Sequence, residues 1–147
     1  MGALPEGVEN APASTSLAWK DPAGWKREAG SGMRVATYAL PDGAECSVIS
    51  LPGAAGGDLA NVNRWRGQMG INEVASLQGL ATSVKTPIGA STLVDFEGAG
   101  AQQGRRMVAA ILTDGGTSWF FKLTGPNAAV GQAKPNLIKL LGTLSRG

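Results

Sequence analysis

The sequence predicts an α+β fold, an antiparallel β-sheet flanked by helices on both faces. Two groups of β-rich segments lie on either side of a helical segment, and the turns within each group suit antiparallel neighbours. One strand, 105–113, is apolar on both faces from Met107 to Leu112, so we expect it to be covered on both sides. The helical segment 58–69 and a second amphipathic segment at the end of the chain are available as the two covers.

The first strand group is a hairpin. Residues 33–40 (MRVATYAL) and 45–51 (ECSVISL) are rich in β-formers, and PDGA at 41–44 supplies the turn between them. Cys46, the single cysteine of the chain, lies in the second run. We expect it to be a small buried core residue, not a reactive thiol.

The second strand group comprises residues 91–97, 105–113 and 117–124, with a tight Asp-Gly-Gly turn at 114–116. Side chains alternate between the two faces of a strand. Within 117–124 one face carries Trp119, Phe121 and Leu123. We expect both strand groups to join in one continuous sheet.

A glycine-rich loop, LPGAAGG at 51–57, leads into the helix predicted at 58–69. Such loops hold phosphate when free backbone N–H groups point at it and a Lys or Arg assists. This loop has neither GxxxxGK[ST] nor GxGxxG spacing. Asp58 stands where the N-cap is expected, and its carboxylate would occupy the positive end of the helix dipole. We therefore expect the loop to cap its own helix and not to bind phosphate.

The predicted helix 58–69 is amphipathic. At about 100° per residue, its apolar side chains fall on one arc and are expected to face the core. They are Leu59, Val62, Trp65 and Met69. The opposite side, expected in water, carries Asn61, Arg64 and Gln68.

Arg66 lies at the edge of the apolar arc, beside Asn63, where an unpaired guanidinium is costly. Two interpretations stay open. In the first, Arg66 is structural and binds a carboxylate, such as Asp95 or Glu97, or the carbonyl groups of a loop. In the second, Arg66 lines a recognition surface with Asn63 and Gln68. The candidate interaction surface on this helix comprises Asn61, Asn63, Arg64, Arg66 and Gln68.

The last segment, GPNAAVGQAKPNLIKLLGTL at 125–144, is predicted to be a helix. Pro126 and Pro135 stand at expected first-turn positions. Leucine or isoleucine recurs at helical spacing at Leu137, Ile138, Leu141 and Leu144. Residues 70–90 carry no strong pattern, and we expect a short helix near 73–79 followed by an extended SVKTPIG segment.

Composition excludes several classes of function. The sequence has no histidine and one cysteine, which removes the usual general base, the Ser-His-Asp and Cys-His arrangements and the common zinc-ligand sets. With 13 basic and 11 acidic residues, the net charge of +2 is too small for a nucleic-acid-binding surface. No apolar run has the length of a transmembrane helix. We expect a protein that is not an enzyme and has no catalytic residue, cofactor or metal.

Asp95 and Glu97 are the remaining candidates for acid–base chemistry. They alternate onto one face of a strand, the arrangement that a hydrolase with two carboxylates needs. Neither has an obvious neighbour in the sequence that would tune its pKa, and a solvated strand face explains them better. Of the pair Arg105 and Arg106, one is expected to be exposed and the other to neutralise Asp95 or Glu97 on the neighbouring strand.

Residues 1–16 (MGALPEGVENAPASTS) lack apolar periodicity and are predicted to be a flexible tether to a single domain at 17–147. They contain no signal peptide. A tether is natural in an exported protein whose leader was cut away. We therefore expect an exported protein of the periplasm or the outer cell envelope, and a lipid anchor in the removed leader is a further hypothesis.

Three segments, GSGMRVATYAL (30–40), SVISLPGAAGGDLANVNRWRGQMG (47–70) and WFFKLTG (119–125), resemble a family of uncharacterised bacterial envelope proteins that includes lipoproteins. They cover under a third of the chain, and no lipobox cysteine stands near its start. The order of elements is also similar to the Mog1/PsbP-like fold. That resemblance implies a binding or assembly module without catalytic residues.

Three functions stay open. The first is a non-enzymatic interaction or assembly module of the cell envelope, whose unknown partner meets the helix 58–69. The second is a small-ligand-binding domain with a pocket near Trp65, Arg66 and Trp119, which would take an anionic or aromatic ligand. The third is a hydrolase that uses Asp95 and Glu97, and the missing histidine argues against it.

Overall fold

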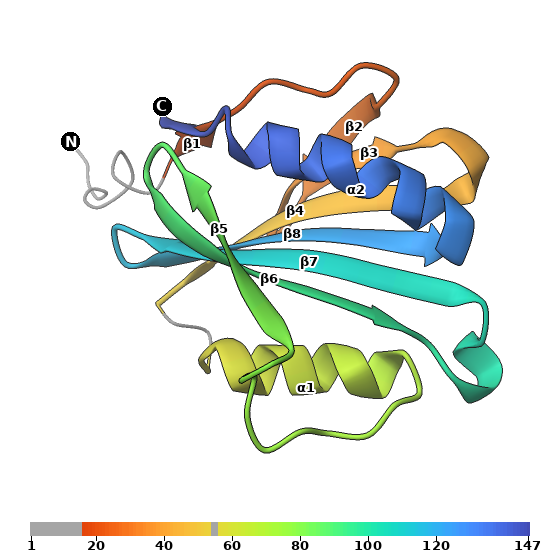
Figure 1. Ribbon diagram of the computed structural model, residues 1–147. Helices are drawn as coiled ribbons and strands as arrows, with labels where there is room; N and C mark the ends of the chain where they lie inside the picture. Colours follow the sequence, from red (N-terminus) through yellow and green to blue (C-terminus); the bar gives the residue numbers. More distant parts are fainter. Residues whose placement is uncertain (1–15, 54–55) are drawn as a thin grey trace.

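The computed structural model describes residues 16–53 and 56–147. The tether predicted at 1–16 therefore lies outside the described residues, apart from Ser16. A seven-stranded antiparallel sheet lies between the helices α1 (Asp58–Gln68) and α2 (Asn127–Leu141), which cover opposite faces (Figure 1). The predicted fold class, an antiparallel sheet with helices on both faces, is confirmed.

The sheet has the strand order β2-β3-β4-β8-β7-β6-β5. Its strands are β2 (Lys26–Ser31), β3 (Arg34–Ala39), β4 (Glu45–Pro52), β5 (Ala81–Thr86), β6 (Gly89–Glu97), β7 (Arg105–Asp114) and β8 (Thr117–Pro126). Short 3-10 turns lie at Pro41–Gly43 and Gly100–Gln102. The ends of the described chain meet in a two-stranded ladder, in which β1 (Leu17–Ala18) pairs with β9 (Ser145–Arg146).

The two predicted strand groups join in one continuous sheet. Strand β4 of the hairpin pairs with β8 along its whole length, for example Val48 with Phe121. Strand β7 is buried on both faces, as its sequence predicted: Val108 faces α2 and Ala109 faces α1. Cys46 is fully buried, as expected.

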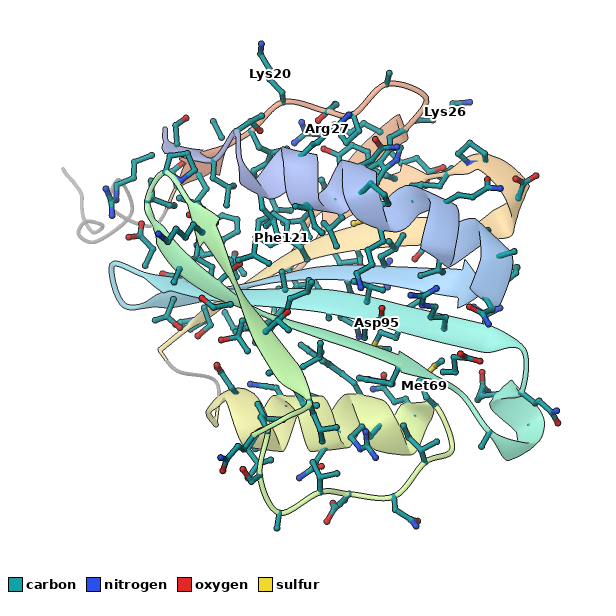
Figure 2. All side chains as sticks on the ribbon, viewed as in Figure 1. Lys20, Lys26, Arg27, Met69, Asp95 and Phe121 are labelled. Atoms are coloured by element: carbon teal, nitrogen blue, oxygen red, sulfur yellow. The ribbon has the colours of Figure 1, made fainter. Side chains whose placement is uncertain are left out.

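The α2 face carries the larger core. Figure 2 shows Phe121 in the layer between the sheet and α2. Its main members are Tyr38, Val48, Val108, Leu112, Trp119, Phe121, Leu123, Val130, Leu137 and Leu141. The segment after β1 adds to this cover, because Trp19 packs edge-on against Trp119 and Phe121.

The α1 face carries a smaller core, which lies over β6, β7 and β8. It comprises Val62, Trp65, Met69, Val94, Met107, Ala109, Ile111 and Phe120. Ile49 and Leu51 of β4 are only partly buried at its margin. This helix therefore leaves part of the sheet uncovered on its own side.

Several predictions about local structure are wrong. Residues 73–79 contain no helix and form a loop before β5. Leu59 is exposed, whereas Asn61 is buried in its place. Pro135 lies in the middle of α2, not in its first turn. Asp58 was expected at the N-cap of α1, but Gly57 holds that position with a φ of 91°. Asp58 is the first residue of the helix, and no side chain caps the helix with a hydrogen bond.

Neither helix in the described part of the chain is long and apolar enough to cross a lipid bilayer.

Candidate functional site

The uncovered part of the α1 face forms an open groove of about 450 Å³, here called the α1 groove. It lies between α1 and the strands β3, β4 and β8. Its lining residues are Met33, Arg34, Ile49, Leu51, Arg64, Trp65, Gln68, Phe120 and Lys122. A volume of this size is in the range of small-molecule sites in proteins.

The inner part of the groove is apolar and aromatic. Trp65 of α1 packs edge-on against Phe120 of β8, with ring centroids 5.4 Å apart, and both side chains are almost completely buried. Ile49 and Leu51 of β4 continue this surface and are half-buried. Met33, at the turn before β3, is 63% exposed and lies on the rim. The apolar surface open to an occupant therefore comes mainly from Met33, Ile49 and Leu51.

Three cations meet at the groove, and none of its lining residues is acidic. They come from three elements: Arg34 from β3, Arg64 from α1 and Lys122 from β8. Nζ of Lys122 lies 5.2 Å from the centroid of the Trp65 ring, a cation–π distance. Within residues 16–53 and 56–147, neither Arg64 nor Lys122 forms an ion pair with a carboxylate. Arg34 has one loose and exposed partner, Glu45, at 3.7 Å.

Lys122 is the least hydrated of these cations. Burial lowers the pKa of its ammonium group below the ordinary value, and the charges of Arg64 and Arg34 lower it further. Desolvation and like charges both disfavour the protonated form. A negative group in the groove would raise the pKa of Lys122, because it would form an ion pair with the ammonium group.

The predicted interaction surface on the helix is divided by the structure. Arg64 and Gln68 are exposed and line the α1 groove. Asn61, expected in water, is buried, and its Nδ2 donates to the carbonyl of Gly57 at 2.8 Å. Asn63 exchanges two hydrogen bonds with the backbone of Val74, at 2.8 and 2.9 Å. Sequence periodicity could not separate these roles, because a polar side chain that binds a loop looks like one that binds water.

Arg66 is structural in this arrangement. Its Nε donates to the carbonyl of Asn72 at 2.7 Å, and its guanidinium lies over the ring of Phe96. The alternative with a loop carbonyl is thus correct, and the alternative with Asp95 or Glu97 is wrong. Arg66 holds the loop after α1 in place and is not among the residues that line the α1 groove.

The predicted grouping of Trp65, Arg66 and Trp119 around one pocket is wrong. Trp65 faces the α1 core, whereas Trp119 belongs to the core on the other face of the sheet. Phe120 and Trp119 are neighbours in β8 and point to opposite faces of the sheet. The sheet therefore separates Trp65, which packs on Phe120, from Trp119. Alternation within β8 already predicts this separation, and it also places Lys122 on the face of Phe120. Arg34 sits at a β-bulge against β4, and no signal in the sequence indicates its place in the groove.

Asp95 is held in an ion-pair network on the α2 face. Arg106 donates to both of its carboxylate oxygens, at 2.8 and 2.7 Å, and Nζ of Lys134 in α2 donates at 2.7 Å. The hydrogen bond from Arg106 lowers the pKa of Asp95 most, and Lys134 lowers it further. The prediction that one of the two arginines neutralises Asp95 or Glu97 and the other is exposed is confirmed: Arg106 binds Asp95, and Arg105 is exposed. An ionised carboxylate with two cationic partners is a poor general acid.

No cluster of three or more metal-binding side chains occurs within the described residues. In the loop of 51–57, residues 54 and 55 lie outside the described part of the chain, while β4 ends at Pro52 and Gly57 holds the N-cap position of α1.

The layers and the strand order define an α+β fold of the PsbP-like type. The chain is similar to the solution structure of cyanobacterial PsbP (CyanoP) from Synechocystis sp. PCC 6803, with a TM-score of 0.53 and 15% identity over 100% of this chain and 99% of that one. It is also similar to a crystal structure from Bacteroides thetaiotaomicron VPI-5482, with a TM-score of 0.57 and 14% identity. That match covers 94% of this chain and 47% of the other, so the chain spans about half the length of that protein.

No family model and no curated protein matches the sequence. The two solved structures confirm the predicted PsbP-like fold. At 14% and 15% identity they show the fold alone.

Proposed function

We propose that the protein is a non-catalytic binding module and that the α1 groove binds an acidic group of its ligand or partner. One observation carries this proposal: three cations from three separate elements meet at an apolar groove whose lining contains no carboxylate. A half-buried cation without a partner costs free energy, which a bound anion offsets. The absence of histidine and the neutralisation of Asp95 support a role without catalysis.

The sequence resemblance to bacterial envelope proteins supports a place in the cell envelope. We propose that the module works there after export, in the periplasm or at the outer envelope. An envelope protein or component that carries an exposed acidic group would be a suitable partner.

The test is a titration followed by NMR on isotope-labelled protein, with acetate, phosphate, a simple aromatic sulfonate and an acidic hexapeptide. We expect shift changes to concentrate on backbone amides around Arg34, Arg64 and Lys122 for at least one of these anions. The Arg64→Gln, Lys122→Met double variant should lose them. The matched control, Lys85→Met with Arg105→Gln, removes the same charge from exposed positions outside the groove and should keep them.

Two results would contradict the proposal. Shift changes scattered over the whole surface would indicate non-specific attraction of anions by a basic protein. An equal loss in the two double variants would show that net charge, and not the groove, determines binding.

A further inference from the structure

We infer that the α1 groove takes a small amphiphilic anion, with one acidic group on a flat apolar body. This inference rests on the proposed function and adds the chemical class of the ligand. Other candidates in the described residues are weaker. The second groove, beside Lys20 and Lys139, includes Asp21 among its lining residues, and the cluster around Asp95 is already neutralised.

The apolar wall is the first argument. Five of the nine side chains that line the groove are apolar. Met33, Ile49 and Leu51 supply its exposed apolar surface, because Trp65 and Phe120 are almost completely buried. An inorganic anion would satisfy the cations but would leave this surface in contact with water. A ligand with a flat apolar body removes that surface from water, at about 25 cal/mol for each Å² that it covers. The groove therefore favours an anion that carries such a body.

The distribution of charge is the second argument. Arg34 and Arg64 are exposed to water, so their interaction with an anion is screened. Lys122 alone is substantially desolvated, beside the indole of Trp65. One desolvated cation matches one acidic group. The two arginines at the rim would mainly attract the anion and accelerate its association.

The hydrogen bonding of the backbone is the third argument, and it favours a small molecule over a peptide. Strands β3, β4 and β8 each have a paired neighbour on both sides in the sheet, and Arg64, Trp65 and Gln68 lie within α1. The groove therefore offers no free strand edge, and main-chain pairing is a principal source of affinity for extended peptides. A small anion needs only the side chains that the groove provides.

The test uses anilinonaphthalenesulfonate, whose fluorescence rises in apolar surroundings, and phenylnaphthylamine, which has the same ring system without the sulfonate. We expect the sulfonate to bind at one site. The neutral compound should bind at least about tenfold more weakly, since a charge-assisted contact supplies about that factor in affinity. Lys122→Met should weaken the sulfonate about tenfold and leave the neutral compound unchanged. Arg105→Gln is the control and should change neither.

Three further measurements keep the test decisive if Lys122→Met perturbs the fold. Arg64→Gln removes an exposed side chain, so it leaves the fold intact, and it should slow sulfonate association, most strongly at low salt. NMR of the Lys122 side chain should show its pKa rise when the sulfonate is bound. NMR mapping on the native protein must place the sulfonate next to Trp65.

The possible failures separate the inference from the proposed function. Equal affinity for the sulfonate and the neutral compound overturns both, because the groove would then be a purely apolar site. Displacement of the sulfonate by sulfate or by an acidic hexapeptide at lower concentration than by an aromatic sulfonate overturns the inference and leaves the proposed function standing. Binding of the sulfonate elsewhere, with no anion in the groove, overturns both.

Discussion

The two faces of the sheet use their cations differently. On the α2 face, Arg106 and Lys134 both lie 2.7 Å from the carboxylate of Asp95. On the α1 face, Lys122 and Arg64 lie beside a groove and have no carboxylate within ion-pair distance among the described residues. The first group of charges ties a helix to the sheet, and the second is available to a ligand.

The two faces of the sheet are covered to different extents. Helix α2 has 15 residues, and the segment that carries Trp19 and Trp25 completes the cover on its side. Helix α1 has 11 residues and reaches only to the margin of β4. A face that is closed must neutralise every charge that it buries, whereas an open face can keep a charge half-hydrated. The unpaired cations are thus found where the cover ends.

The largest effect is expected when Asp95, the carboxylate that binds two cations on the α2 face, is removed. Asp95→Ala leaves Arg106 and Lys134 half-buried without an ion-pair partner, so the free energy of unfolding should fall by about 2–3 kcal/mol. Urea denaturation measures the change. Glu97→Ala is the control, because Glu97 lies two residues further along the same face but is exposed. Equal losses in both variants would show that the network adds nothing to stability.

High pH should act on the same closed face through Tyr38. Burial and the hydrogen bond that Tyr38 donates to Asp21 raise its pKa to about 12. Because the unfolded tyrosine loses its proton near pH 10, the folded state binds the extra proton between pH 10 and 12, and stability falls as pH rises through that window. We expect about 1–2 kcal/mol to be lost there.

The measurement is urea denaturation from pH 9 to pH 12. It uses a Cys46→Ala background, because burial also raises the pKa of the Cys46 thiol to about 12. Tyr38→Phe in that background should flatten the curve over this window. A curve of unchanged slope would show that Tyr38 does not titrate with folding.

A smaller effect is expected at the attachment of α1. Asn63→Ala removes two hydrogen bonds to the backbone of Val74 and should cost about 1–2 kcal/mol, with faster hydrogen exchange at the Val74 amide. Asn72→Ala is the control, since only the backbone of Asn72 is used as an acceptor. If exchange at Val74 stays slow, the loop is held by other contacts.

The fold was predictable where strands are buried. Segment 105–113 is apolar on both faces, and 117–124 carries Trp119, Phe121 and Leu123 on one face, as expected of covered strands. The edge strands β2 (KREAGS) and β5 (ATSVKT) lack that signal, because their side chains are mostly exposed and pairing with a neighbour determines them. Neither was predicted as a strand of the sheet, although the extended segment 83–89 overlaps β5.

The site was predictable only in part. Helix periodicity indicated Arg64 and Gln68 correctly, since both are exposed. It failed at Leu59 and Asn61, since Leu59 is exposed and Asn61 is buried. Both lie in the first turn of α1, where the chain enters the helix from a glycine-rich loop. The groove itself depends on how far α1 extends over the sheet, which is a tertiary property. No local pattern could bring Arg34 to within reach of Lys122.

The smallest effect tests the open face directly. Lys122→Met replaces a half-buried ammonium by an apolar side chain of similar length, so the free energy of unfolding should stay equal or rise by a fraction of a kcal/mol. The sign follows from the lowered pKa. At pH values between the lowered pKa of Lys122 in the folded state and its ordinary pKa in the unfolded chain, the unfolded chain binds more protons, so stability rises with pH. Below both pKa values Lys122 is charged in both states, and the burial of its charge destabilises the folded state. Urea denaturation at neutral and alkaline pH measures both effects, and the variant should lose this rise. A loss of stability like that of Asp95→Ala would mean that Lys122 has a structural partner, and the contrast between the two faces would fail.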